Sequence, residues 1–370
     1  MKLLIRYSWR LSPTYLRLLR YAFLAIVAGF ISPSCFCSGL GDSVPADNAL
    51  SESLKIYFVD VEGGQATLFV TPEGESLLID TGWPGNNGRD ANRIVAAAKD
   101  AGIHKVDYVI ITHFHTDHVG GVPQLTARIP VRSFVDHGDN RESGDKETVE
   151  GWNAYRDVLK NGKQKRISVK PGDTLPIQGM IASIVSSDGS LLHDATRNAS
   201  NGNPGCQSAE HFPPDQTENH RSVGTLITFG KLRILDLGDL TREKEFDLMC
   251  PVNQLGKVDI YVVSHHGWRE SGSPLLLNSI VPRVAIMDNG AKKGGSPSAW
   301  DAIKRSPRLE DLWQLHFSDE GGKEHNVADE LIANPSGPDA GNYLKLTAWG
   351  DGSFEIYNSR TLKKKHYGPK

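Results

Sequence analysis

Three histidines and an aspartate occur within six residues, directly after an apolar stretch. The segment 108–121 reads YVIITHFHTDHVGG, so these side chains are His113, His115, Asp117 and His118. Imidazole and carboxylate are the ligands that borderline divalent metals such as zinc prefer. His113 and His115 are two residues apart while Asp117 and His118 are adjacent, so one ion cannot easily take all four. The spacing favours two neighbouring ions, one for each pair.

Three more residues of ligand type, Asp80, Asp239 and His266, each follow an apolar stretch that is typical of a strand. Rigid strands that end in ligands aim those side chains at one point, although Asp80 could be a turn residue and Asp239 a helix cap. His265 would point the opposite way from His266 if the strand stays extended. We therefore expect His266 to be the ligand and His265 to be the second choice.

The order His113-x-His115-x-Asp117-His118 resembles the metal motif of the metallo-β-lactamase superfamily and matches it at every ligand position. The resemblance implies an α/β (α+β) fold, a four-layered αββα sandwich of two mixed sheets with outer helices. It also implies a metal-dependent hydrolase with two divalent ions, zinc or else manganese, in which Asp117 both binds an ion and orients the attacking water.

The same resemblance gives roles to the residues at the other strand ends. It implies that Asp239 bridges the two ions, since two neighbouring cations need an anion between them, and that His266 is the last ligand. Asp80 would be an outer carboxylate that orients a ligand histidine, because such partners fix the tautomer and the orientation of the ring.

One ligand position departs from the superfamily pattern. Where many members have a histidine before the last hairpin, residues 218–222 read Glu-Asn-His-Arg-Ser. This resembles the Asn-x-x-Ser stretch of the competence-protein branch, the hydrolase-like domain of DNA-uptake channels. Asn219 then takes the histidine position, and its amide oxygen is a weaker and harder ligand that would accept manganese as readily as zinc. His220 is the alternative, through a shift of one residue.

The branch resemblance covers about residues 55–290 and has a second departure. Residues 62–65 read Glu-Gly-Gly-Gln where the branch has Gly-Gln-Gly-Asp, so an amide replaces the expected carboxylate at Gln65. This change leaves the substrate open. A phosphodiester is the first choice, a lactone or β-lactam is the alternative, and a non-catalytic metal-binding module is the third possibility.

No serine or cysteine nucleophile is needed for this chemistry. Two cations that share a water lower its pKa towards neutrality, and they polarise the carbonyl or phosphoryl oxygen under attack. Lys292 and Lys293, on a glycine-rich loop after the last ligand, could neutralise a phosphate or carboxylate of the substrate, or they could simply be solvated. Four further residues are candidate pocket residues: His137, Trp83, Trp268 and His325.

Strand and helix patterns alternate from about residue 54 to residue 360, which fits a single hydrolase domain better than two. Strands are expected early and late, with helices such as 89–101 and 146–160 between them, so we expect two packed sheets with helices outside. Residues 187–219 are rich in Gly, Asn, Pro and Asp and show little periodicity. We interpret them as an insertion loop over the mouth of the site.

Residues 1–46 differ from the rest of the chain. A basic segment precedes an apolar run at 21–31 that is too short for an ordinary membrane span. We expect a signal peptide, or else an uncleaved anchor as the only membrane contact, and an exported protein that is periplasmic or secreted. The overall charge is −3, and these residues hold five basic groups and one acid, which leaves −7 for the rest. A body this acidic argues against a broad nucleic-acid-binding surface.

Four cysteines are present, and two of them lie in residues 1–46. The remaining pair, Cys206 and Cys250, could form a disulfide in an exported protein or could stay free. Neither Cys206 nor Cys250 lies in a spacing typical of metal ligands.

Overall fold

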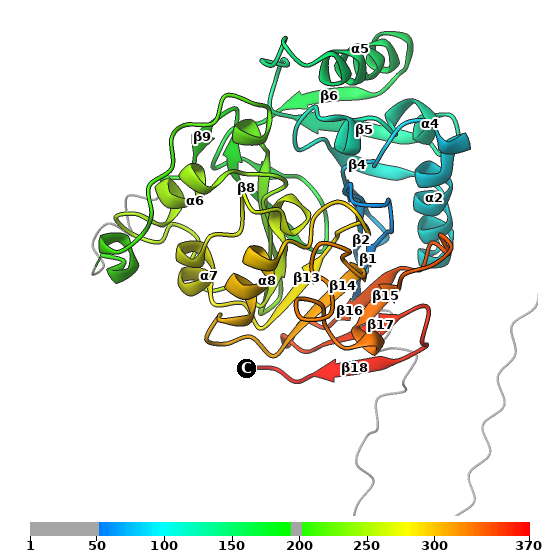
Figure 1. Cartoon of the computed structure of the whole chain (residues 1–370). Helices are drawn as coiled ribbons and strands as arrows, with labels where there is room; N and C mark the ends of the chain where they lie inside the picture. The colour runs from blue at the N-terminus through cyan, green and yellow to red at the C-terminus, as the bar shows by residue number, and fades with distance from the viewer. Residues whose placement is uncertain (1–51, 194–201) are drawn as a thin grey trace, which may run out of the picture. The chain divides into compact units, whose positions relative to one another are not determined.

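Two β-sheets face each other in the computed structural model, and helices lie on the outer side of each sheet (Figure 1). The structure describes residues 52–193 and 202–370. The expected signal peptide or anchor at 1–46 and part of the expected insertion loop lie outside the described residues. Within the described residues, no helix is long and apolar enough to cross a lipid bilayer.

The first sheet combines strands from both ends of the described chain. Its strand order is β18-β17-β16-β1-β2-β3-β4-β5-β6. Pairs from β18 to β3 are antiparallel, and pairs from β3 to β6 are parallel. The strands are β1 Leu54–Phe58, β2 Thr67–Val70, β3 Ser76–Ile79, β4 Val106–Ile110, β5 Val131–Asp136, β6 Lys165–Ser168, β16 Leu344–Ala348, β17 Phe354–Asn358 and β18 Lys364–Tyr367.

The second sheet has the same mixed construction. Its order is β15-β14-β13-β12-β11-β10-β8-β7, with β9 paired to β8. Pairs from β7 to β11 are antiparallel, and pairs from β11 to β15 are parallel. The strands are β7 Thr174–Leu175, β8 Ile181–Ser187, β9 Ser190–Leu191, β10 Gly224–Phe229, β11 Leu232–Asp236, β12 Ile260–Val262, β13 Val284–Met287, β14 Asp311–His316 and β15 Ile332–Asn334.

Helices α2, α4 and α5 pack on the first sheet, and α6, α7 and α8 pack on the second. The α-helices are α2 Arg89–Ala101, α3 Thr116–Val119, α4 Val122–Thr126, α5 Lys146–Asn161, α6 Arg242–Met249, α7 Pro274–Ile280 and α8 Pro297–Lys304. The 3-10 helices are η1 Asn86–Gly88, η3 Pro204–Gln207, η4 Asn219–Arg221, η5 Ser264–Gly267 and η6 Asp329–Leu331.

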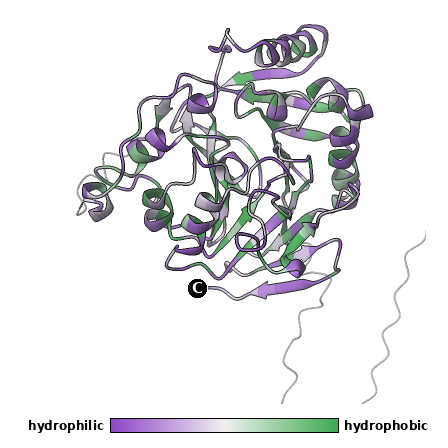
Figure 2. Ribbon diagram, viewed as in Figure 1, coloured by the Kyte–Doolittle hydropathy of each residue, from purple (hydrophilic) through white to green (hydrophobic). Residues whose placement is uncertain are grey.

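The apolar core is divided by the sheets into three clusters. Side chains of alternate strand residues from both sheets, such as Ile56 and Ile234, form the cluster between the sheets. The other alternate residues, such as Tyr57 and Leu235, pack against the helices on either side. Strands buried on both faces are therefore mostly apolar, as the green parts of the strands in Figure 2 show. Four layers result, and the expected αββα fold class is confirmed.

The structure also differs from the expected elements. The short strands β6, β7, β9, β15 and β18 were not expected, and β18 extends the first sheet beyond residue 360. Strands of two to four residues, several with charged side chains, carry too little periodicity to be recognised.

The described part of the expected insertion loop is held mainly against α6 and α7. A disulfide joins Cys206 to Cys250, so the pairing that the sequence left open does form. Asn203 Nδ2 donates hydrogen bonds to Met249 O (3.1 Å) and Ser279 Oγ (2.8 Å). These bonds fix residues 203–207 against α6 and α7, and the interpretation of the loop as a cover for the site mouth stays a prediction.

Candidate metal centre

The expected ligands lie at the carboxyl ends of parallel strands in both sheets. Asp80 follows β3 and His113 follows β4 in the first sheet, while Asp239 follows β11 and His266 follows β12 in the second. Parallel neighbours end at the same edge of a sheet, where ligand sites commonly form. The topology therefore brings segments that are far apart in the sequence to one place.

Four of these side chains form a buried group whose donor atoms all lie within 4.8 Å of one another: Asp117, His118, Asp239 and His266. His118 Nε2 lies 3.2 Å from Oδ2 of both Asp117 and Asp239. His266 Nε2 lies 3.1 Å from Asp117 Oδ2 and 3.3 Å from His118 Nε2. Two imidazole nitrogens and two carboxylates that converge in this way form the kind of donor set that zinc binds.

Each of these two histidines has a carboxylate behind its other ring nitrogen. Asp80 Oδ2 lies 2.7 Å from His118 Nδ1, and Asp80 itself accepts hydrogen bonds from the backbone N (2.8 Å) and Oγ1 (2.6 Å) of Thr112. Asp288 Oδ1 lies 3.5 Å from His266 Nδ1. The contact of Asp80 holds Nε2 of His118 towards the centre, which is the geometry expected for Asp80. Asp288 lies behind His266 without a hydrogen bond to its ring.

His113 and His115 lie beside this group and use one ring nitrogen each for other contacts. Thr112 Oγ1 is 3.0 Å from His113 Nδ1, while His113 Nε2 is buried without a hydrogen-bond partner and lies 3.9 Å from Asp239 Oδ2. His115 Nε2 lies 3.0 Å from Glu142 Oε2, which leaves Nδ1 to contact an ion. Asp239 therefore lies between the two pairs of the motif.

His265 and His266 both have left-handed backbone, with φ of 53° and 54°. His265 Nε2 lies 3.4 Å from Asp239 Oδ2, and His266 Nε2 lies 3.6 Å from Asp239 Oδ1. The expectation that His265 points away from His266 is therefore wrong. Two consecutive left-handed residues end the extended strand, and both rings then approach the same carboxylate.

Asn219 and His220, the two candidates for the position where many superfamily members have a histidine ligand, have different surroundings. Asn219 is 8% exposed and its Oδ1 has no hydrogen-bond partner. His220 Nδ1 instead lies 2.8 Å from Glu243 Oε1, and its Nε2 faces Gly189. The geometry thus disfavours His220 as a ligand, and it leaves Asn219 and His265 as candidates.

The charges of the centre suit a bound cation. Burial raises the pKa of the Asp117 carboxyl, but the positive charges of Lys293 and His118 outweigh burial and hold this pKa well below its usual range. Burial also raises the pKa of Asp239, and there His118, His265 and His266 outweigh it, so this pKa too lies well below its usual range. Burial lowers the pKa of His265 to about 4. At neutral pH these two acids are ionised and His265 is neutral, which are the forms that bind a metal.

His266 has the opposite shift. Burial lowers its pKa, but the carboxylates of Asp239 and Asp288 outweigh burial and raise the pKa to about 9. An ion that binds His266 must displace this proton, so metal binding is coupled to proton release.

The residues present fit a pair of divalent ions. Buried polar atoms normally have a partner, yet His113 Nε2, Asn219 Oδ1 and Asp239 Oδ1 have none among the described residues. These three atoms are an imidazole nitrogen, an amide oxygen and a carboxylate oxygen, all of which bind divalent metals. Their ligand role stays a prediction, because the structure shows the donors and no ion.

A second group of metal-ligand type, Asp60, Glu62 and His316, lies elsewhere in the described residues. His316 Nε2 is 2.7 Å from Asp60 Oδ1, and Arg93 Nη1 is 2.9 Å from Asp60 Oδ2. Both oxygens of the central carboxylate are therefore already paired with basic groups, so ion pairs account for this cluster.

Sequence reasoning missed three acids at the centre: Glu142, Glu218 and Asp288. Asp288 follows β13 in the same way that Asp80 follows β3, so the same strand-end signal could have found it. Glu142 and Glu218 lie in irregular segments and gave no such signal. The backbone N of Glu218 donates to Glu142 Oε2 (2.8 Å), which connects the segment of Asn219 to the partner of His115.

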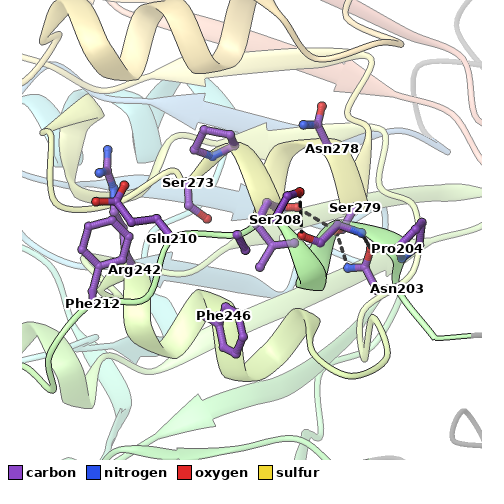
Figure 3. A pocket seen from close by; sticks show the side chains of 14 residues that line it. Asn203, Pro204, Ser208, Glu210, Phe212, Arg242, Phe246, Ser273, Asn278 and Ser279 are labelled. Carbon is purple, nitrogen blue, oxygen red and sulfur yellow. Dashed lines mark hydrogen bonds between the residues drawn. The ribbon is translucent and has the colours of Figure 1, made fainter.

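A separate cavity of about 430 Å³ lies beside η3, α6 and α7 (Figure 3). Its lining includes Asn203, Arg242, Phe246 and Ser279, and it includes none of the expected metal ligands. The cavity is therefore not part of the candidate metal centre.

Comparison with protein families supports the superfamily resemblance. Residues 59–193 match the family described as the metallo-beta-lactamase superfamily. The matched segment includes the His113 to His118 motif and ends before Asp239. In the solved structures, the metallo-beta-lactamase fold protein YhfI from Bacillus subtilis has a TM-score of 0.44 and 11% identity, covering 71% of this chain and 95% of its own.

Individual relatives match only part of their own length. Recombination protein 2 of Haemophilus influenzae is 26% identical over 239 residues, covering 63% of this chain and 24% of that protein. ComE operon protein 3 of Bacillus subtilis is 23% identical over 260 residues, covering 65% and 29%. Hydroxyacylglutathione hydrolase of Stenotrophomonas maltophilia is 38% identical over 63 residues, covering 17% and 21%. The first two agree with the competence-protein branch, and this chain spans less than a third of each relative.

Proposed function

Since this chain carries a metallo-β-lactamase superfamily domain with a potential metal site, we propose that it is a hydrolase that uses two divalent ions to cleave a phosphodiester. The observation that carries this proposal is the convergence of Asp117, His118, Asp239 and His266 within 4.8 Å, next to the unpartnered His113 Nε2. A saturated structural zinc site needs four ligands. More donors than that gather here, around a carboxylate that has both oxygens facing histidines.

In this proposal each ion has its own set of ligands, and Asp239 is shared. One ion would be held by His113 and His115, with His265, Asn219 or both completing the set. The other would be held by Asp117, His118 and His266. The assignment follows the two pairs of the motif. Asp239 is the shared ligand because its Oδ2 lies near His118 as well as His113 and His265, and its Oδ1 lies near His266.

The bound ions would lower the pKa of a water and neutralise charge that develops on the substrate. The protein's own residues prepare that step. Asp80 and Glu142 fix the rings of His118 and His115 through the nitrogen that faces away from the centre. Asp117 remains ionised and is the side chain proposed to orient the water.

A phosphodiester is favoured by the branch resemblance to nuclease-like proteins and by the cationic side chain of Lys293 at the centre. A cyclic ester or amide is the second candidate. It is supported by the local similarity to hydroxyacylglutathione hydrolase, a hydrolase by name, and by the acidic body of the chain.

The test is a panel of substrates with metal-loaded protein: bis(p-nitrophenyl) phosphate, a lactone and a cephalosporin, each with zinc and with manganese. We expect the phosphodiester to be cleaved fastest, and the double variant D117A/H118A to lose nearly all activity. Hydrolysis that survives this double substitution would contradict the proposed mechanism. Bound metal without hydrolysis of any substrate would favour a non-catalytic metal-binding module.

The number of bound ions tests which residue completes the ligand set of the ion at His113 and His115. We expect His265→Ala to lower the stoichiometry of bound metal from two towards one, because it removes an imidazole 3.4 Å from the shared carboxylate. His220→Ala is the matched control and should bind two ions, since His220 pairs with Glu243. Metal analysis of the purified variants decides, and loss of an ion in His220→Ala alone would contradict the assignment.

A further inference from the structure

Lys293 reaches the metal centre, whereas the sequence offers Lys292 and Lys293 equally as partners for an anion of the substrate. Its ammonium contacts Asp117 Oδ2 and lies 5.0 Å from the centroid of the Trp83 ring. Lys292, the preceding residue, is exposed. The two lysines therefore have different surroundings, and only Lys293 touches an expected ligand.

Close backbone contacts fix the position of the Lys293 loop. The backbone N of Gly290 donates to Lys293 O (2.8 Å), which closes a tight turn. Gly63 packs so closely on this turn that an added Cβ would lie 2.9 Å from Gly290 N and 3.0 Å from Lys293 Cβ. The next residue, Gly64, packs on Asp117 in the same way, because an added Cβ there would lie 2.4 Å from Asp117 O. The loop and the Asp117 segment are therefore held against each other.

Once the centre holds ions, the carboxylate of Asp117 no longer neutralises the charge of Lys293 alone. Asp117 is the only carboxylate within 4 Å of its ammonium among the residues that the structure describes. When Asp117 binds an ion, its negative charge is shared with that ion, and the ammonium, with a side chain only 33% exposed, lies beside a cation. An unpaired charge in such a site is unfavourable. An anionic oxygen of a substrate would remove this imbalance.

A groove continues from Trp83, away from the ligands. It has a volume of about 600 Å³, and Trp83, Pro84, Thr116 and Pro123 line it. None of the expected ligands lines the groove, and Trp83, whose ring centroid lies 5.0 Å from the Lys293 ammonium, is the residue that connects it to the centre. Helix α5 adds Glu147 and Glu150 to the lining, and these acids would repel a second or third phosphate of a longer chain.

We propose that Lys293 binds an anionic oxygen of the substrate and that the Trp83 groove holds an aromatic or apolar group attached to it. The substrate is then a small phosphodiester with an aromatic substituent, and not a nucleic-acid polymer. This inference rests on the proposed function for the bond that is cleaved. The anion-binding role of Lys293 does not depend on cleavage and can be tested alone.

The first experiment measures the binding of inorganic phosphate to metal-loaded protein by calorimetry. Lys293→Ala should weaken this binding about tenfold or more, the usual loss for a charge-assisted hydrogen bond. Lys292→Ala should stay within about twofold of the unsubstituted protein, and both variants should keep two ions by metal analysis. Equal phosphate affinity in the two variants would overturn the proposal, as would loss of metal in Lys293→Ala, which would make the lysine structural.

The second experiment separates the anion from the aromatic group. Lys293→Ala should raise KM for bis(p-nitrophenyl) phosphate about tenfold. KM for the neutral ester p-nitrophenyl acetate should stay within about twofold of its value in the unsubstituted protein. Trp83→Ala should raise KM for the aromatic diester to a similar extent, since stacking on an aromatic ring contributes this much, and should leave phosphate affinity unchanged. A single-stranded oligodeoxynucleotide that competes more tightly than the small diester would overturn the assignment of substrate class.

If neither substrate is cleaved, the calorimetry still decides. Phosphate binding that is lost only in Lys293→Ala would support the anion site while the proposed function fails. Phosphate binding that is the same in all variants would contradict the anion site whether or not hydrolysis is seen.

Discussion

The two nitrogens of each imidazole at the centre have different tasks. At His118 and His115 a carboxylate engages one nitrogen and leaves the other for the centre. A histidine ring that is free to rotate would lose entropy on binding an ion, whereas these rings are already oriented. The acids behind the histidines therefore contribute to metal affinity without touching an ion.

Asp236 is a buried acid of a different kind and permits a prediction about pH. Burial raises the pKa of its carboxyl to about 7. The hydrogen bonds that it accepts from Gln65 Nε2 (2.6 Å) and the backbone N of Gly238 (3.0 Å) lower the pKa, but by less than burial raises it. An acid whose pKa is raised in the folded state stabilises the protein fully below its unfolded pKa, near 4. That contribution is lost as the pH rises through the folded pKa.

Asp236→Asn should remove this pH dependence, because the amide cannot ionise. We expect the unfolding free energy of the unsubstituted protein, relative to the variant, to fall by about 1.4 kcal/mol per pH unit between about pH 4.5 and 6.5. The measurement is urea unfolding of both proteins over this range without added metal. Parallel pH profiles for the two proteins would contradict a raised pKa at Asp236.

At the residue scale, the sequence predicts ligands well where they share a motif or follow an apolar strand. Asp80, Asp239 and His266 were placed at the centre on that basis, and the structure brings them there. His265 was misjudged, because its direction depends on a left-handed backbone that no residue pattern announces. Glu142 gives no signal in the sequence, and Lys293 is not distinguished there from Lys292, since irregular loops position these side chains through tertiary contacts.

At the scale of elements, close glycine contacts hold the ligand-bearing segments together. A Cβ at Gly64 would lie 2.4 Å from Asp117 O, closer than such contacts occur without a shift of the backbone. The strand ends could be predicted from periodicity, but this contact could not, because it joins two loops. An added Cβ at Gly64 would also lie 3.1 Å from Asp117 Cβ, so a larger residue there would displace Asp117.

Gly64→Ala should therefore disturb both stability and metal binding. We expect a loss of about 1–3 kcal/mol of unfolding free energy, as for other overpacked positions, together with weaker binding of the ion at Asp117. Gly144→Ala is the matched control, because an added Cβ there meets nothing within 4 Å, and it should change stability by less than about 0.5 kcal/mol. Chemical unfolding and metal titration of both variants test this. Equal effects at the two glycines would refute it.

At the scale of the whole molecule, the C-terminal strands are part of the first sheet and its core. β16 pairs with β1 from Leu54↔Ala348 to Phe58↔Leu344. Leu344 and Leu346 belong to the cluster between the sheets, as do Phe354 and Ile356 of β17. The sequence predicted β16 and β17 as strands but not their partner, because a long-range pairing leaves no local signal.

Removal of residues 343–370 should therefore prevent stable folding. Each fully buried large apolar side chain contributes about 1.5–3 kcal/mol, so the loss of these four alone is comparable with the 5–15 kcal/mol that stabilises a typical domain. We expect no cooperative thermal transition by circular dichroism for this truncated chain. Removal of residues 369–370 alone takes away only an exposed ion pair of Lys370 and should leave the transition near its original temperature. A cooperative transition in the longer truncation would show that the first sheet is complete without β16.

The pairing of β1 with β16 also determines when the protein can finish folding during its synthesis. β1 is among the first described elements to leave the ribosome, and its partner β16 is among the last. Until then one side of β1 has unpaired backbone groups, and an exposed apolar strand edge is a site of mispairing between chains. Such a fold, dominated by contacts between distant residues, forms slowly. The chain is therefore most vulnerable to aggregation while it is being made, and a holding chaperone should matter more to its yield than the stability of the finished protein.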